Sequence, residues 1–270
     1  MVAKTDGGYA RRVMRRLYII GLTFVFIVGI VLAITLHRST SETQIAFSQS
    51  PVQSRPNEPA VDVSTYHLVT EKIEHERAGL SLRYRRAASD SERESTLVQA
   101  RESFLSSVSN IFPYWYGTVW DFHGTTETPG KGKIACGYFV STVLRDLGLK
   151  VQRTKLAQQA SENIILSLTT NDHIKRFRES PLNKFVEEVK ALGAGLYVVG
   201  LDVHVGFILN TGDDVFFVHS SYGAPYCVVK ERAAESRILG SSRYRVLGKL
   251  SDDDNLILKW LKADQFFTRT

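Results

Sequence analysis

Three residues have the types and the order that thiol catalysis needs, namely Cys136, His204 and His219. Cys136 follows a glycine-containing segment, residues 129–133, and stands in the first turn of a helix predicted over residues 136–147. Backbone N–H groups and the positive end of the helix dipole lower a thiol's pKa, which increases the nucleophilic thiolate near neutral pH. A lone cysteine can equally be a small buried apolar residue, so the histidines decide the interpretation.

Both histidines lie in aliphatic strand patterns. His204 is inside the pattern 202–209, and His219 ends the next one, 215–219. A buried histidine needs partners for its ring nitrogens, because an unpaired buried polar group costs about 1–3 kcal/mol. On adjacent antiparallel strands, one imidazole can take the thiol proton while a second group fixes the tautomer of that ring. The pattern therefore predicts a Cys–His catalytic site.

The residues around these positions resemble a known family. The strings Ala135-Cys-Gly-Tyr-Phe-Val140, His204-Val-Gly-Phe-Ile208 and Phe217-Val-His-Ser-Ser221 look like the NlpC-type family of papain-like cell-wall cysteine peptidases. The resemblance covers residues 111–250. It implies that Cys136 is the nucleophile, His204 the general base and acid, and His219 the orienting residue. The implied reaction is hydrolysis of amide bonds in peptidoglycan stem peptides, commonly next to γ-linked D-glutamate.

The resemblance also points to residues that would border the nucleophile. A family tyrosine that lies upstream is matched by Tyr116 or by Tyr114, and the spacing to Cys136 does not decide between them. The backbone N–H of Cys136 would supply part of the oxyanion hole, and Gly137 is a further candidate for substrate or oxyanion contact.

The sequence departs from the family pattern in two ways. Ala135 replaces the usual Asp before the cysteine, and Gly137 replaces the usual Ser after it, which weakens the inference about substrate. The segment between Cys136 and His204 is also long for the family, so residues 151–192 are predicted to be a helical insertion that shapes the cleft.

Other functions remain open for the same residues. Cys136 and Cys227 could form a disulfide in an oxidising compartment, and these cysteines with both histidines could in principle hold zinc, although no spacing matches a zinc module. We expect no cofactor and no metal.

A catalytically inactive wall-binding domain is a second class of function. A Cys–His acyltransferase on the same fold is a third, because the aromatic segment 114–122 could hold a lipid chain, line a peptide cleft or pack in the core.

The elements that must position these residues follow from apolar periodicity. Helical patterns cover residues 66–88 and then about 89–110, and two further helices are predicted within 151–192, split near Asn171 and Pro181. Five strand patterns follow, over residues 195–201, 203–210, 214–219, 226–230 and 242–250, with a turn at 210–214. Helices first and antiparallel strands afterwards predict an α+β fold of papain-like type, with N-terminal helices packed on an antiparallel sheet.

The N-terminal region predicts a membrane anchor. Residues 17–36 are twenty residues without a charge, enough for a helix to cross the roughly 30 Å hydrocarbon core of a bilayer. A buried soluble helix and a cleaved signal peptide are the alternatives, but the run has no polar stripe and no cleavage site follows it. The arginines before the span predict a cytoplasmic N-terminus, with the rest of the chain extracytoplasmic or periplasmic. This is the topology of a single-pass inner-membrane protein.

Charge and composition limit the classes of partner that the chain is expected to bind. The chain has 270 residues and a formal net charge of +6, of which residues 1–16 carry +4. The basic tail is explained by topology and anionic lipids, so we expect no nucleic-acid partner. A hydrophobic fraction of 43% excludes a wholly disordered chain. Protein partners remain unknown.

The predicted organisation has five parts. They are a basic tail (1–16), a transmembrane signal anchor (17–36), a flexible linker (37–65), a helical lead-in (66–110) and the cysteine hydrolase domain (111–270).

Overall fold

The computed structural model describes residues 62–270. The predicted basic tail and membrane span, and nearly all of the predicted linker, lie outside the described residues. Within residues 62–270 no helix combines the length and apolarity that crossing a bilayer requires.

A six-stranded sheet is the centre of the fold, and each pair of neighbouring strands in it is antiparallel. Its order across the sheet is β4 (Ile174–Arg178), β9 (Tyr244–Lys249), β5 (Gly195–Leu201), β6 (Val205–Asn210), β7 (Val215–Ser220) and β8 (Val228–Arg232). Strand β5 is buried at each of its seven positions, as a central strand covered on both faces should be. The α+β class and the antiparallel sheet are therefore confirmed.

Each face of the sheet has its own apolar core. On one face, side chains such as Val198 and Phe207 join a core with α3 (Asp90–Trp115), α4 (Cys136–Asp146) and α6 (Ser161–Leu168). On the other face, side chains such as Val199 and Phe217 pack with α7 (Leu182–Ala191) and with α8 (Arg237–Ser241). The alternation of successive strand residues between the two cores follows from the two-residue period of a strand.

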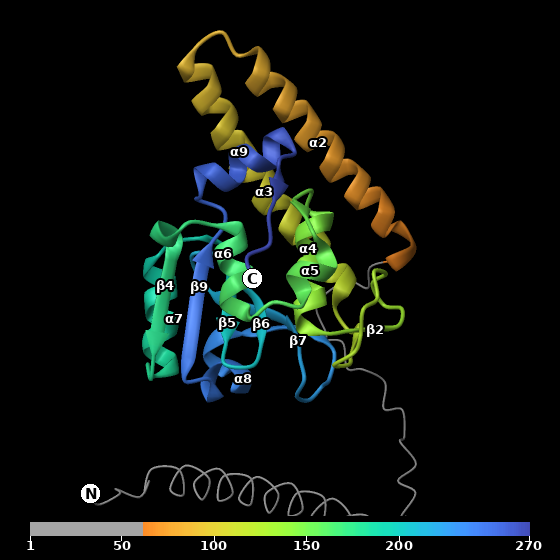
Figure 1. The fold of residues 1–270 in the computed structure, drawn as a ribbon, viewed down its shortest axis with the longest axis vertical. Coiled ribbons are helices and arrows are strands. Elements are labelled where there is room, and N and C mark those ends of the chain that lie inside the picture. Colours follow the sequence, from red (N-terminus) through yellow and green to blue (C-terminus); the bar gives the residue numbers. More distant parts are fainter. Residues whose placement is uncertain (1–61) are drawn as a thin grey trace, which may run out of the picture. The chain divides into compact units, whose positions relative to one another are not determined.

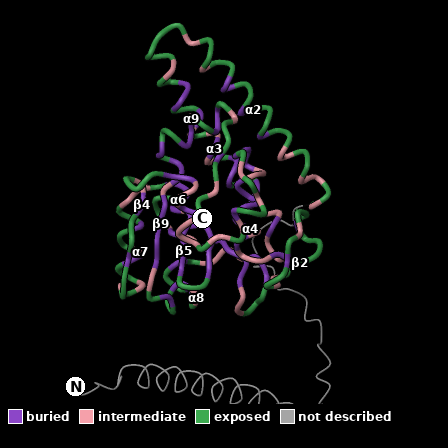
Figure 2. Tube along the Cα trace, in the orientation of Figure 1, coloured by how far each residue is buried: buried purple, intermediate pink, exposed green. Residues whose placement is uncertain are grey.

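A long helical hairpin precedes the sheet. Helix α2 (Tyr66–Arg86) packs along α3. In Figure 1 the turn between α2 and α3 and the loop that joins β7 to β8 lie at opposite ends of the described part of the molecule. Only four residues of α2 are buried, and Figure 2 shows exposed residues along most of this helix. Its apolar positions are divided, because Ile73 and Leu80 are buried whereas Leu68 and Leu82 are exposed.

The start of α2 is bonded to the end of α4. The Tyr66 hydroxyl donates to Asp146 Oδ2 at 2.7 Å and accepts from the Trp115 indole N–H at 2.9 Å. Burial first, and then the neighbouring carboxylate, raise the pKa of Tyr66 far above its ordinary value. The phenol therefore stays protonated and keeps donating to Asp146.

The remaining elements are short. They are η1 (Val63–Thr65), β1 (Val119–Trp120), β2 (Lys133–Ile134), β3 (Lys150–Val151), α5 (Arg153–Ala157), η2 (Asn171–His173), η3 (Ala233–Glu235), α9 (Asp254–Lys262) and β10 (Gln265–Phe266). Strand β1 pairs with β2, and β3 pairs with β10, both in parallel. Helix α9, which the sequence patterns did not predict, packs against both α2 and α3.

Two segments fold differently from the sequence-based expectation. Helix α3 continues through Pro113 to Trp115, beyond the predicted end near residue 110. Proline removes only one helical donor, to the carbonyl of Ser109, and Ser109 is exposed to water. Residues 174–178 form the edge strand β4 rather than a helix, because pairing with β9 overrides the three-residue spacing of Ile174 and Phe177.

Candidate active site

Cys136 is the first residue of α4, as predicted. The preceding chain is held by backbone pairing, since the Ala135 N–H donates to the Gly124 carbonyl at 2.9 Å. Only glycine fits at position 124, because a Cβ there would lie 2.5 Å from the Ile134 nitrogen. The Ser220 hydroxyl donates to the Ile134 carbonyl at 2.7 Å, which ties the end of β7 to the residues before the cysteine.

Strands β6 and β7 separate at the end of the sheet where the thiol lies. Strands β6 and β7 pair only from Phe207–Val218 onward, although they continue to Val205 and Ser220 at this end. The Val205 N–H is thereby left to face the Cys136 thiol. His204 directly precedes Val205, so the backbone brings the predicted base and the predicted nucleophile to the same end of the sheet.

The thiol is held in its protonated form. Burial raises the pKa of Cys136 above its ordinary value, and the N–H groups of Val205, Gly137 and Cys136 lower it by less. The expected pKa lowering by the helix terminus is therefore present but outweighed, because the half-buried sulfur loses the hydration that a thiolate needs. Such a thiol needs a base to become nucleophilic.

The two predicted histidines are bonded to each other and to a carboxylate. His204 Nε2 lies 2.9 Å from His219 Nδ1, and His219 Nε2 lies 3.2 Å from Glu231 Oε1. Both imidazoles are buried, and His219 stacks on Phe217 with ring centroids 3.9 Å apart. The adjacency predicted from the strand patterns is thus present in the structure.

The carboxylate fixes the tautomers of both rings. Burial lowers the pKa of His204 well below 6.5 and also lowers that of His219, although Glu231 opposes the latter shift, so both rings are neutral at neutral pH. A carboxylate only accepts, so His219 Nε2 carries the proton and its Nδ1 accepts from His204 Nε2–H. His204 Nδ1 is then unprotonated. It takes part in no hydrogen bond within residues 62–270, and it is not sealed from solvent. That nitrogen is free to accept a proton.

Glu231 is the member of this hydrogen-bonded cluster that the sequence patterns missed. The register pairs His219 with Val229 and Phe217 with Glu231, so the carboxylate lies on the same sheet face as the histidine, one step along β8. The predicted strand ended at Lys230. Extending it by one residue and applying the two-residue alternation would have found Glu231.

Two glycines allow the close packing of the site. A Cβ at Gly206 would lie 2.6 Å from the Phe217 ring and 2.8 Å from His219 Cβ, so glycine leaves room for the stacked rings. A Cβ at Gly137 would overlap the Ala157 carbonyl oxygen at the end of α5. The absence of the family's serine at position 137 therefore has a physical reason, which is that α5 covers the first turn of α4.

The two candidate tyrosines are placed differently. Tyr114 lies in α3, its hydroxyl is 3.0 Å from Thr65 Oγ1, and its ring is 5.3 Å from that of Tyr66. These contacts direct it to the start of α2. Tyr116 directly follows α3, is half-buried and packs against the same core as Cys136. Among the contacts described for residues 62–270, none joins Tyr114 to Cys136.

Cys136 and Cys227 are both free thiols in the structure. Cys227 is buried, with 3% of its surface exposed, and its backbone forms an isolated antiparallel β-bridge with Val119. We expect folded protein that has never been reduced to give two thiols per chain when it is denatured and titrated with a chromogenic disulfide reagent. A count of zero would mean that the pair is bridged and that Cys136 is not a free nucleophile.

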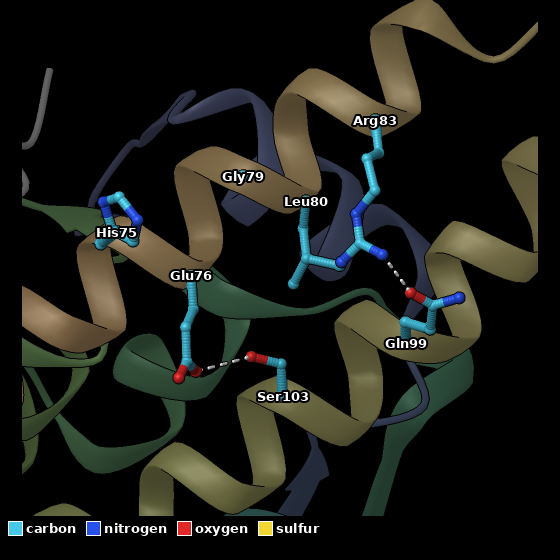
Figure 3. Close-up of a pocket in the computed structure, with 7 residues that line it drawn as sticks. All are labelled: His75, Glu76, Gly79, Leu80, Arg83, Gln99 and Ser103. Carbon is cyan, nitrogen blue, oxygen red and sulfur yellow. Dashed lines mark hydrogen bonds between the residues drawn. The ribbon is translucent and has the colours of Figure 1, made fainter.

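Two cavities lie outside this cluster. The larger, of about 390 Å³, is between α2 and α3 and is lined by His75, Glu76, Gly79, Leu80, Arg83, Gln99 and Ser103 (Figure 3). Within it Arg83 donates to Gln99 at 2.7 Å. The smaller, of about 110 Å³, lies beside Tyr197 and Lys249. Across residues 62–270, no group of three or more His, Cys, Asp or Glu side chains is arranged to hold a metal ion.

The arrangement has the components of nucleophilic catalysis on a carbonyl group. It contains a thiol at a helix start, an imidazole nitrogen left free by a fixed tautomer, and backbone N–H groups around the sulfur. Comparison with known proteins found no matching family model, no matching curated protein and no matching solved structure.

Proposed function

We propose that this chain is a cysteine hydrolase that cleaves amide bonds. The observation that carries the proposal is the chain of bonds from His204 through His219 to Glu231, beside a thiol faced by the Val205 N–H. A buried histidine pair could be purely structural. However, Glu231 fixes the one tautomer that leaves a ring nitrogen of His204 free, and this is the tautomer that a general base requires.

The reaction follows from these protonation states. His204 Nδ1 takes the Cys136 proton as the sulfur attacks the carbonyl carbon, and the resulting imidazolium gives that proton to the leaving amine. The backbone N–H groups of Cys136 and Gly137 are the available donors to the oxyanion. Water then attacks the thioester, again with His204 as the base, and regenerates the thiol.

For the substrate we propose peptidoglycan stem peptides. The support is the resemblance of the segments around Cys136, His204 and His219 to cell-wall peptidases, together with the predicted extracytoplasmic side for everything after residue 36. We further propose that residues 17–36 anchor the enzyme in the cytoplasmic membrane, with its N-terminus in the cytoplasm. The substrate would thus be on the same side of the membrane as the catalytic domain.

Mass spectrometry of muropeptides tests this function. We expect the full-length chain in detergent to convert purified muropeptides into pairs of products whose masses sum to the substrate plus one water. A product that gains an acyl group without water would identify a transferase instead. Unchanged muropeptides after prolonged incubation with protein whose circular dichroism shows a folded chain would rule out the proposed substrate.

A further inference from the structure

A line of aromatic rings leads outward from the catalytic base. The Tyr222 ring lies 5.1 Å from His204, nearly perpendicular to it, and the Trp120 ring lies 6.5 Å from Tyr222. The other rings against His204 are Phe217 and His219, and both are fully buried. Tyr222 and Trp120 are only partly buried. Of the three rings that lie against His204, Tyr222 is thus the one that also contacts solvent.

Backbone hydrogen bonds hold both residues in place. The Trp120 N–H donates to the Tyr226 carbonyl at 2.8 Å, and the Tyr226 N–H donates to Gly223 at 2.7 Å. The Ser221 N–H donates to the Cys227 carbonyl at 2.9 Å, closing the segment that carries Tyr222. The two rings are therefore presented by a bonded framework, as a preorganised binding surface requires.

The polar atoms of these rings are unused. Among residues 62–270 neither the Tyr222 hydroxyl nor the Trp120 indole N–H makes a described hydrogen bond. Both atoms reach solvent, because no buried side-chain nitrogen or oxygen in that range lacks a partner. Partly buried aromatic rings with free polar tips offer apolar area and a hydrogen-bond donor together.

We propose that Trp120 and Tyr222, here called the aromatic wall, bind an apolar group of the substrate next to the scissile bond. The proposal rests on the proposed function, since it concerns the substrate of the same Cys136 site. The group it predicts is an apolar side chain or ring, because the two ring planes are tilted by 59° to each other and offer apolar area on two sides while leaving their donors usable. The aromatic wall is thereby a specificity determinant, and Cys136 and His204 remain the reacting groups.

Alkylation of Cys136 by two probes tests the aromatic wall without knowledge of the substrate. The full-length chain in detergent is treated with iodoacetamide or with N-benzyl iodoacetamide, and labelling of each cysteine is followed by peptide mass spectrometry. We expect the benzyl probe to label Cys136 about tenfold faster than iodoacetamide, after correction for their rates with free cysteine. We expect the ratio to fall near one in Trp120→Ala and Tyr222→Ala, and to be kept in Tyr222→Phe.

A matched control separates this effect from general loss of structure. Phe267 is an aromatic residue that is 74% exposed near the C-terminus, and Phe267→Ala should keep the wild-type ratio. The iodoacetamide rate itself reports whether each variant still presents Cys136. An unchanged ratio in both wall variants would overturn the proposal, whereas absence of native-state labelling at Cys136 by either probe would overturn the proposed function.

Discussion

Cys136→Ala is expected to lower amide hydrolysis by more than about a thousandfold, because no other group at the site can form the thioester. The substitution should leave the fold intact. Helix α4 is not capped by this side chain, since its N-cap residue is Ala135, and the residue is only half-buried. The measurement is muropeptide turnover by mass spectrometry, alongside circular dichroism and thermal unfolding of the same preparation.

The matched control is Cys227→Ala. This cysteine is as free as Cys136 but lies in the core, and removing its sulfur leaves a small cavity that costs about 1–2 kcal/mol. We expect lower thermal stability with activity retained. The two variants thus separate chemistry from packing. If Cys136→Ala turned over muropeptides at the wild-type rate, the mechanism would be wrong.

Loss of the orienting bonds is expected to give the second largest effect. His219→Ala removes the acceptor of His204 Nε2–H, so the imidazole can rotate and exchange tautomers, and kcat should fall about a hundredfold with little change in KM. Glu231→Gln should cost roughly tenfold, because the amide can present either an acceptor or a donor to His219. A fall confined to KM in both variants would mean that the pair contacts substrate rather than positions the base.

The pH profile supplies an independent readout. Burial lowers the pKa of His204 well below 6.5, so kcat/KM should be full at pH 6.5 and should decline only as the pH drops through that lowered pKa and the base becomes protonated. In Glu231→Gln the plateau should drop while the acid limb stays below pH 6.5. An acid limb above pH 6.5 in the wild type would contradict a buried neutral base.

Much of this site could be predicted because it depends on local patterns. Cys136 follows from the helix start, and the two histidines follow from strands whose alternation and hairpin turn can be read in the sequence. Their mutual distance then follows from antiparallel pairing. The same reasoning predicted β5 with the boundaries that the structure has.

The parts of the fold and site that were not predicted depend on pairing and packing between segments that are distant in the sequence. Glu231 was missed because the predicted strand ended one residue short of it, at Lys230, and because its place beside His219 depends on the register between β7 and β8. Strand β4 was assigned to a helix because its two buried residues are three apart and its partner β9 lies some seventy residues later. The net direction of the Cys136 pKa shift could not be known either, because it depends on how deeply the folded chain buries the sulfur.

The bond between Tyr66 and Asp146 has a mechanical consequence. Tyr66 is the first residue of α2, and its hydroxyl bonds both the last residue of α4 and the last residue of α3, so force on the chain ahead of it acts on both helices. Helix α4 has 11 residues and is about 16 Å long. Its far end carries Cys136. The start of α2 and the proposed nucleophile are therefore linked through the length of a single helix.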